Sequence, residues 1–119
     1  MNNITDPVTT VIGINSLRNK FLGEFDGQGF EITLNINRPT NNYIGFFGFC
    51  SHATIKNLGV NGFVIGNSLS GSLIGAAEYS NVTNCYNTGS VTGTGGLIGN
   101  YGGYQNNITN CYNTGSVTG

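Results

Sequence analysis

Thr-Asn-Cys-Tyr-Asn-Thr-Gly-Ser-Val-Thr-Gly fills residues 83–93, and the same eleven residues return without a change at positions 109–119. Such a duplication indicates a tandem repeat. The flanking sequence extends the match, because the segment that starts at Ile55 aligns with the one that starts at Val82, and that one aligns with the segment at Ile108. The spacing of these three starting points, about 26 residues, is typical of one coil of a β-helix.

A second landmark follows nearly the same period. Gly-Phe-Phe-Gly at positions 45–48 returns as Ser-Leu-Ile-Gly at 72–75 and as Gly-Leu-Ile-Gly at 96–99, so the second step is shorter than the first. The difference comes from three extra residues within positions 67–72. An insertion between blocks that otherwise align without gaps predicts a surface loop there.

Within each unit, short β-prone segments alternate with Gly and Asn, as at 97–98, 108–109, 111–112 and 116–118. Nowhere do apolar residues follow the spacing of an amphipathic helix. Segments this short pair best with their own copies one coil away, about 4.8 Å distant. The sequence therefore predicts an all-β fold, a right-handed parallel β-helix (β-solenoid) of about 26 residues per coil.

Stacked copies form columns, which we define as residues at the same position in successive coils. Three apolar columns are predicted to face the core: Ile55, Val82 and Ile108; Leu58, Cys85 and Cys111; Val64, Val91 and Val117. An asparagine column lies between two of them: Asn57, Asn84 and Asn110. Asn tolerates a left-handed backbone, so we expect a bend at this column, with amides hydrogen-bonded to their copies. The recurrent glycines fit corners that need a positive φ or a close backbone approach: Gly66, Gly75, Gly93 and Gly99.

The thiols of Cys85 and Cys111 are expected to be reduced and to face the core. Neighbouring coils bring their Cα atoms to about 4.8 Å, which a disulfide permits, but in-register Cβ atoms stay nearly as far apart and a disulfide needs about 3.8 Å. Leu58 occupies the same column, which also favours an apolar environment. With Cys50 the chain has three cysteines, an odd number that does not suit a disulfide scaffold.

The order of these blocks resembles the GLUG repeat of bacterial and archaeal surface proteins. The Leu-Ile-Gly segments ending at Gly75 and Gly99, each followed by an I/V-x-N-L/C block and a V-x-G, carry the resemblance over residues 44–119. Upstream, Phe-Asp-Gly-Gln-Gly-Phe-Glu-Ile at 25–32 is similar to a segment that often precedes such repeats. Ser72 departs from the motif, as does the plain alternation at 32–36. The resemblance implies one continuous domain, with a capping segment and first coil at 1–43 and repeat coils at 44–119. It also implies an extracellular or cell-surface location and no reaction.

Charge and hydropathy disfavour several partners. Four basic and five acidic residues give a net charge of −1, so there is no electrostatic footprint for nucleic acid or an anionic membrane. No apolar run has the length of a membrane span, and the first residues lack the features of a signal peptide.

The candidate chemical groups are sparse. Glu24 and Asp26 lie two residues apart, as a glycosidase pair could, but no basic residues cluster around them, and Asp26-Gly27 suits a turn. Cys50 and His52 would share one face of an extended segment, yet two ligands are too few for a zinc site. We therefore expect no catalytic residues, no metal and no cofactor.

One surface could bind a ligand. Tyr86 and Tyr112, flanked by Thr83 and Thr109, are predicted to stack outward and could offer a regular face to a carbohydrate. The alternative is that aromatic and β-branched residues simply suit an exposed sheet.

The last repeat block reaches Gly119 with no polar cap visible in the sequence. An uncapped coil exposes a strand edge, so we expect either flanking repeats of a longer chain or self-association by end-to-end stacking. These features predict a non-enzymatic β-solenoid module that serves as a spacer, an adhesin stalk or a self-assembling, filament-forming subunit. The alternative is a carbohydrate-binding or carbohydrate-active β-helix protein.

Overall fold

The computed structural model describes residues 4–8, 21–100 and 105–118, and this part of the chain contains twelve strands and no helix. The strands, in chain order, are β1 (Ile4–Val8), β2 (Glu24–Asp26), β3 (Glu31–Asn37), β4 (Phe47–Ser51), β5 (Thr54–Ile65), β6 (Ile74–Glu78), β7 (Asn81–Asn87), β8 (Ser90–Thr92), β9 (Ile98–Asn100), β10 (Asn107–Thr109), β11 (Tyr112–Asn113) and β12 (Val117–Thr118).

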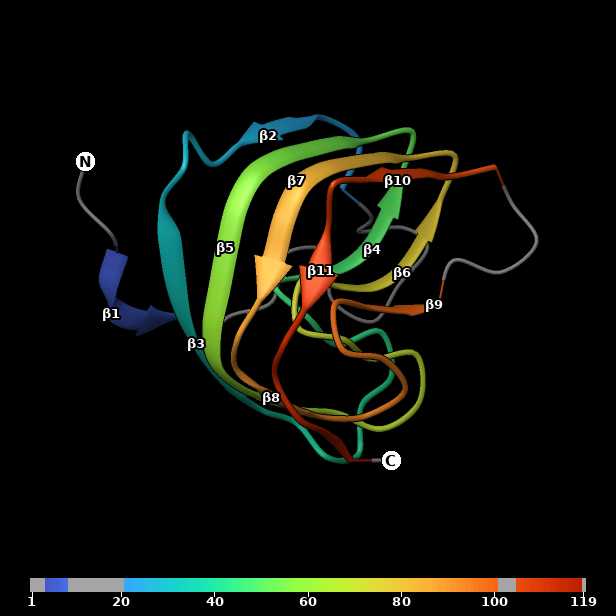
Figure 1. Cartoon of the computed structure of the whole chain (residues 1–119). Helices are drawn as coiled ribbons and strands as arrows, with labels where there is room; N and C mark the ends of the chain where they lie inside the picture. The colour runs from blue at the N-terminus through green and yellow to red at the C-terminus, as the bar shows by residue number, and fades with distance from the viewer. Residues whose placement is uncertain (1–3, 9–20, 101–104, 119) are drawn as a thin grey trace.

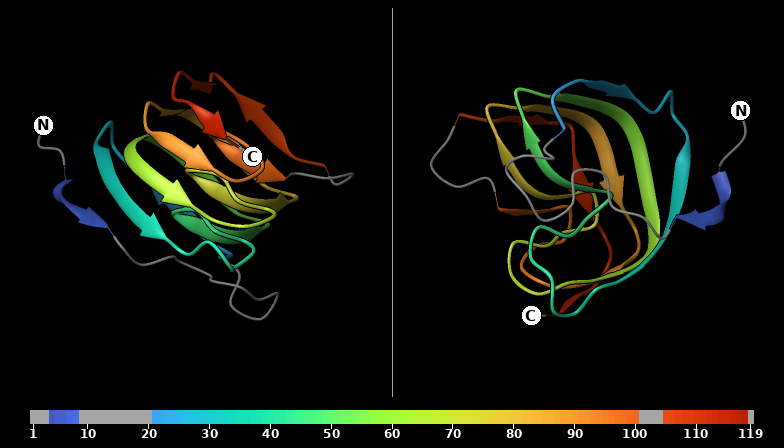
Figure 2. Two further views of the ribbon diagram at one scale, coloured as in Figure 1. Left: turned by 90° about the horizontal axis from the view of Figure 1, so that it is seen from below. Right: turned by 180° about the vertical axis from the view of Figure 1, so that it is seen from behind.

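The strands stack in parallel, each on its counterpart in the next coil. The larger sheet follows the order β1-β3-β5-β7-β10, and the smaller one follows β4-β6-β9. Each coil in Figure 1 runs counter-clockwise, and the later coils lie nearer to the viewer, so the solenoid is right-handed. Figure 2 shows β1 at one end of the stack and β10 to β12 at the other. The predicted all-β, right-handed β-solenoid is confirmed.

The strand register coincides with the sequence repeat. Ile55 lies opposite Val82, which in turn lies opposite Ile108. The same holds for Val64, Val91 and Val117. Residues that align in the sequence are therefore neighbours in space, one strand spacing apart.

β5 is a single strand of twelve residues, longer than the short segments that the sequence suggested. It bends twice without leaving the sheet, at Asn57 with φ 58° and at Gly62 with φ 87°. On one side it pairs with β2 and β3, and on the other with β7 and β8. At each bend one edge keeps a continuous partner strand, β7 around Asn57 and β3 around Gly62, so one strand forms two corners of the coil.

The core runs along the axis of the solenoid between the two sheets. Its inner columns hold aliphatic side chains that are almost wholly buried: Ile32, Leu34, Ile36, Ile44, Ile55, Leu58, Val60, Val64, Leu73, Ile74, Val82 and Val91. Phenylalanines fill the first coils, where Phe25 meets the rings of Phe46 and Phe47 edge-on, with centroids 5.7 and 5.3 Å apart. Burial of these columns is the main force that stabilises the stack.

The predicted insertion at 67–72 lies in the loop between β5 and β6. The recurrent Gly75 is required by close approach, since a Cβ there would lie 2.6 Å from the carbonyl oxygen of Gly48 in the preceding coil. Several corners with positive φ are built from larger residues, among them Tyr43 and Leu69, with φ values of 59° and 56° at matching corners of successive coils. A glycine is therefore not needed at every bend of the coil.

Candidate functional site

An asparagine column forms the first polar ladder of the solenoid. Asn57, Asn84 and Asn110 have φ values of 58°, 55° and 53°, so each turns the chain through a left-handed bend. The Asn84 Nδ2 donates to Asn57 Oδ1 at 3.2 Å, and Asn57 Nδ2 donates to Asp26 Oδ1 at 3.1 Å. The amides of Asn57 and Asn84 thus link their own bends to the neighbouring coil.

Two further asparagine pairs were not singled out in the sequence. Asn107 Nδ2 donates to Asn81 Oδ1 at 2.9 Å. Asn87 is buried, and its Nδ2 donates to Asn113 Oδ1 at 2.6 Å and to the carbonyl of Gly89 at 3.0 Å, while its Oδ1 accepts from the Gly89 N–H. Both pairs could have been predicted from the sequence, because the two asparagines of each pair are separated by one repeat.

The apolar columns are closed in the middle of the stack and open at its last coil. Val64 and Val91 are 1% exposed, whereas Val117 is 45% exposed. A recess of about 530 Å³ lies at this end, lined by Leu97, Ile98, Asn106, Ile108, Cys111, Tyr112 and Asn113. We call this surface, formed by the recess and the outer edges of β10, β11 and β12, the terminal face.

The three cysteines are free; Cys50 and Cys85 are buried, and Cys111 is partly exposed. Leu58 lies opposite Cys85 in the register, and both are buried. Cys85 Sγ donates to the carbonyl of Thr83 at 3.3 Å, and burial raises the pKa of this thiol to about 12. Burial also raises the pKa of the Cys50 thiol to about 12. Such thiols are poor nucleophiles at neutral pH.

Tyr86 and Tyr112 stack on each other as predicted, but Tyr86 also packs against the sheet and does not stand free on its surface. The rings of Tyr86 and Tyr112 stack with centroids 5.3 Å apart and planes only 8° from parallel. Tyr86 lies opposite Gly59, and a Cβ at that glycine would overlap the Tyr86 ring. The ring therefore crosses Gly59. Its hydroxyl donates at 2.8 Å to Oε2 of Glu31, which lies opposite Gly59 in the preceding coil. This bond is the main reason why the pKa of Tyr86 is raised to about 12.

These contacts use most of what Tyr86 could offer to a ligand. One ring face packs over Gly59, the other faces Tyr112, and the hydroxyl is bound to a carboxylate. The hydroxyls of Thr83 and Thr109 lie 3.3 Å apart and bond to each other. Tyr112 is 54% exposed and presents its ring at the terminal face.

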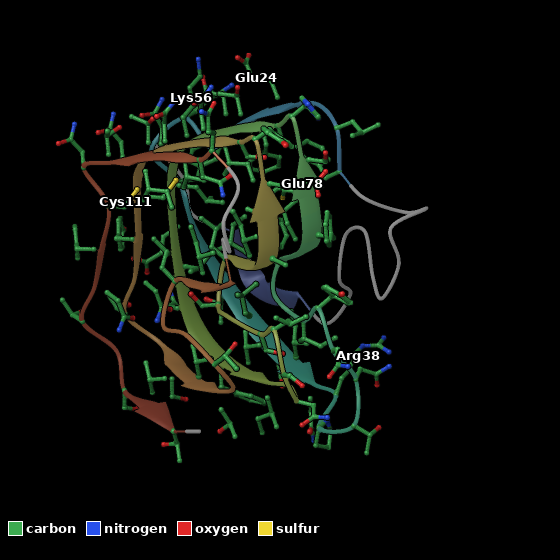
Figure 3. The ribbon with its side chains drawn as sticks, turned by 90° about the vertical axis from the view of Figure 1, so that its right-hand side faces the viewer. Glu24, Arg38, Lys56, Glu78 and Cys111 are labelled. Atoms are coloured by element: carbon green, nitrogen blue, oxygen red, sulfur yellow. The ribbon has the colours of Figure 1, made fainter. Side chains whose placement is uncertain are left out.

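The acidic pair of β2 makes local contacts. Glu24 Oε2 lies 3.7 Å from Lys56 Nζ, and Figure 3 shows these two side chains together at one edge, with Arg38 and Glu78 elsewhere. Asp26 Oδ1 accepts the backbone N–H of Gln28 at 2.9 Å, within a turn. The pKa of Asp26 is lowered, first by that bond, then by the amide of Asn57 and by nearby Lys56.

A second polar cluster, unforeseen from the sequence, lies at the corner after β4. Ser51 is fully buried, and its hydroxyl donates to Glu78 Oε2 at 2.8 Å and lies 3.0 Å from His52 Nδ1. A serine hydroxyl has one proton, so Nδ1 is the donor in the contact with His52. His52 has φ 53° and stacks on Tyr79 at 5.1 Å, so it lies at a bend and not on one extended face with Cys50.

The buried hydroxyl of Ser51 is inaccessible to a substrate, so this cluster is built to hold a corner. Among residues 4–8, 21–100 and 105–118, no three His, Cys, Asp or Glu side chains gather as metal ligands. The same part of the chain holds no helix with the length and apolar character of a membrane span.

Comparison with known proteins identifies one of the repeat units. Residues 66–92 match the family model of the GLUG motif, which confirms the resemblance over this stretch. The matched stretch contains the 67–72 loop, β6, β7 and β8, which together make nearly one full coil. No curated protein and no solved structure is significantly similar to the chain. The chain is thus a β-solenoid repeat module with a GLUG motif in its third coil.

Proposed function

We propose that this GLUG-containing solenoid is a non-enzymatic structural module of a secreted or cell-surface protein, and that its stacked coils act as a spacer or stalk. The observation that carries the proposal is that its repeated polar side chains bond mainly to their own copies. Asn84 bonds to Asn57, Asn107 to Asn81, and Asn87 to Asn113. Such ladders hold coils in register and leave few groups for other chemistry.

The placement of the charged groups also supports a structural role. A hydrolase needs several acidic and basic groups that converge on one point. Here Glu24 is paired with Lys56, Glu31 binds Tyr86, and Glu78 binds the buried Ser51. Each of these contacts joins neighbouring or next-but-one coils, as a structural cross-link does.

The extracellular or cell-surface location rests on the resemblance to GLUG repeats. Labelling of intact cells of the source organism with a membrane-impermeant reagent tests it. Labelled protein is expected, and a protein labelled only after the cells are lysed contradicts the location while leaving the spacer role intact.

The spacer role predicts that coils can be added one at a time. One or two copies of residues 94–119 should be appended after Gly119, and a control should carry a scrambled sequence of the same composition. Each true copy is expected to raise the melting temperature and to lengthen the particle by about 4.8 Å, because each coil stabilises its neighbour. Small-angle X-ray scattering measures the length. Copies that stay unfolded and leave the melting temperature unchanged contradict the proposal.

Carbohydrate binding is the rival function, and exposed Tyr112 is the observation that favours it. Tyr86 contributes little, because its ring and hydroxyl are already engaged. A glycan array probed with the parent chain and with the Tyr112→Ala variant distinguishes carbohydrate binding from a purely structural role. Binding that is lost in the variant supports an adhesive role, whereas no binding by the parent chain removes the rival.

A further inference from the structure

The second bend of β5 carries the one Asn-Gly pair in the sequence, Asn61-Gly62. Asparagine is a chemically labile residue, because the backbone nitrogen of the next residue can attack its side-chain amide. Glycine has no side chain to hinder that attack. Asn61 is therefore the asparagine of this chain whose amide is most easily lost.

The fold itself requires a glycine and an amide at these two positions. Gly62 has φ 87°, and a Cβ there would overlap the carbonyl oxygen of Leu34 in the preceding coil. Asn61 Nδ2 donates to Oε1 of Glu31, the carboxylate that also accepts the Tyr86 hydroxyl. Contacts between coils thus fix both members of the labile pair.

The neighbouring coils hold threonine where this coil holds Asn61. Asn61 lies opposite Thr33 in the preceding coil, and the pairing of the flanking residues places Thr88 and Thr114 in the same column. Threonine has no amide to lose. Among these four positions, asparagine stands where its amide binds Glu31, which ties the departure from threonine to that bond.

The folded strand keeps the reacting atoms apart. Attack requires the backbone nitrogen of Gly62 to reach Cγ of Asn61, and this closes a small ring that an extended strand does not permit. Residues 59–65 of β5 pair in register with β3, and Asn61 is not among the residues with positive φ. The bond to Glu31 holds the side chain as well. Attack is therefore confined to chains in which β5 has separated from β3.

The modification consumes water and releases ammonia, and no atom changes its oxidation state. The Gly62 nitrogen bonds to Asn61 Cγ while the Cγ–Nδ2 bond breaks, and Nδ2 leaves as ammonia with the proton of the Gly62 N–H. Water then opens the cyclic imide at either of its carbonyl carbons. Opening at Cγ gives aspartate. Opening at the main-chain carbonyl carbon gives isoaspartate, in which the chain runs through Cβ and Cγ of residue 61.

Either product is incompatible with the native corner. A carboxylate at residue 61 replaces the donor to Glu31 with a second negative charge beside Oε1, where the two charges repel each other. Isoaspartate also adds an atom to the main chain, which displaces the residues after it from their partners in β3. A chain that is modified while open therefore does not regain the stability of the parent.

We propose that Asn61 is a modification site that records opening of the solenoid. Its amide is retained while β5 is paired with β3 and is lost when the two strands separate. The loss makes the opening irreversible, because the new carboxylate faces Glu31.

Peptide mass spectrometry on the full chain tests the site directly. The protein is held at mildly alkaline pH, folded in buffer in one sample and denatured in guanidinium chloride in the other. We expect Asn61 to be the first asparagine converted in the denatured chain, and its conversion to be at least about tenfold slower in the folded chain. Equal rates in the two samples, or another asparagine converted before Asn61, would overturn the proposal.

Two variants test the protection that Glu31 gives. Glu31→Ala removes the acceptor of the Asn61 amide, and Tyr86→Phe is the matched control because it removes the other bond to the same carboxylate. Conversion of Asn61 in the folded state is expected to rise several-fold in Glu31→Ala and to stay close to the parent rate in Tyr86→Phe. Equal rates in the two variants contradict the protective role of the bond to Glu31.

The consequence of the modification is measured with Asn61→Asp, which mimics one product. Asn61→Thr is its control, because threonine occupies this position in the neighbouring coils. Asn61→Asp is expected to have the lower melting temperature, and Glu31→Gln introduced into both variants is expected to remove the difference, since it removes the repulsion. If Asn61→Asp is as stable as Asn61→Thr, modification does not make the opening irreversible and the proposal fails. None of these results bears on the spacer role, which the appended coils test separately.

Discussion

The asparagine bend shows how one residue type can fix both a backbone turn and the contact between two coils. Asn57 has φ 58°, and its amide both donates to Asp26 and accepts from Asn84. Alanine at this position would keep the unfavourable φ and lose both hydrogen bonds. We expect Asn57→Ala to lower the free energy of unfolding by about 2 kcal/mol.

Urea denaturation measures this loss in the free energy of unfolding. Two further variants separate the contribution of the backbone bend from that of the hydrogen bonds. Asn57→Gly has no Cβ to strain a left-handed bend, so it should recover part of the loss. Asn35→Ala is the control, because Asn35 is exposed in β3 and is not among the positive-φ residues. Equal effects of Asn57→Ala and Asn35→Ala would show that the bend does not need asparagine.

Tyr86 gives the fold a dependence on alkaline pH. Its hydroxyl donates to Glu31, which raises the pKa of Tyr86 to about 12 from an ordinary value near 10. A raised folded-state pKa contributes stability that is fully present below the unfolded pKa and is lost as the pH rises through the folded pKa. Stability should therefore fall between about pH 10 and pH 12.

Ultraviolet titration of the phenols measures this directly. Tyr86→Phe should remove one late-titrating phenol and flatten the alkaline fall in stability. Tyr112→Phe is the control, because it keeps the bond between Tyr86 and Glu31 and should leave the alkaline fall in place. Ionisation of Tyr86 near pH 10, the ordinary value for tyrosine, would contradict the hydrogen bond to Glu31.

The thiols predict a graded chemical reactivity. Burial raises the pKa values of Cys50 and Cys85 to about 12, whereas Cys111 is partly exposed at the terminal face. A thiol reagent at mildly alkaline pH should modify Cys111 first in the folded protein and all three cysteines after denaturation. Peptide mass spectrometry identifies the modified residue, and early labelling of Cys85 would show that its column is not closed.

At the scale of the strands, the packing of β7 on β5 requires a glycine at one position of β5. Gly59 in β5 leaves the space that the ring of Tyr86 in β7 crosses to reach Glu31. Gly59→Ala should displace the ring, break the bond to Glu31, and lower the free energy of unfolding by about 1 to 3 kcal/mol. It should also bring the pKa of Tyr86 back toward its ordinary value.

Gly23→Ala is the matched control for this change. A Cβ at Gly23 would lie 3.5 Å from the Phe21 ring, an ordinary contact. It should leave both the stability and the titration of Tyr86 nearly unchanged. If Gly59→Ala also leaves the stability and the titration of Tyr86 unchanged, the Tyr86 ring does not pack across Gly59.

The elements also show why the repeat predicts some features and not others. Aligned copies such as Val82 and Ile108 occupy the same column, so the alignment alone predicts their pairing. The Tyr86–Glu31 bond joins residues more than one coil apart, and Glu31 lies where the I-x-N-L pattern is absent. The corner of His52 and Tyr79 has no signature either, because such bulky residues rarely take a positive φ.

At the scale of the whole molecule, the two ends of the solenoid have opposite characters. The first coil is rich in phenylalanine and acidic residues, and the last coil is neutral and open. The sequence duplication predicted the stack. It did not predict the recess, because the recess depends on how far the last coil covers the core.

The central claim is that repeated residues lie beside their own copies one coil away. Nuclear Overhauser effects between backbone protons, measured on isotope-labelled protein, test it most directly. We expect cross-peaks that link the strands around Ile55, Val82 and Ile108 in parallel register, each strand displaced from the next by one sequence repeat. Cross-peaks that instead join antiparallel segments within one repeat would contradict the solenoid and every ladder derived from it.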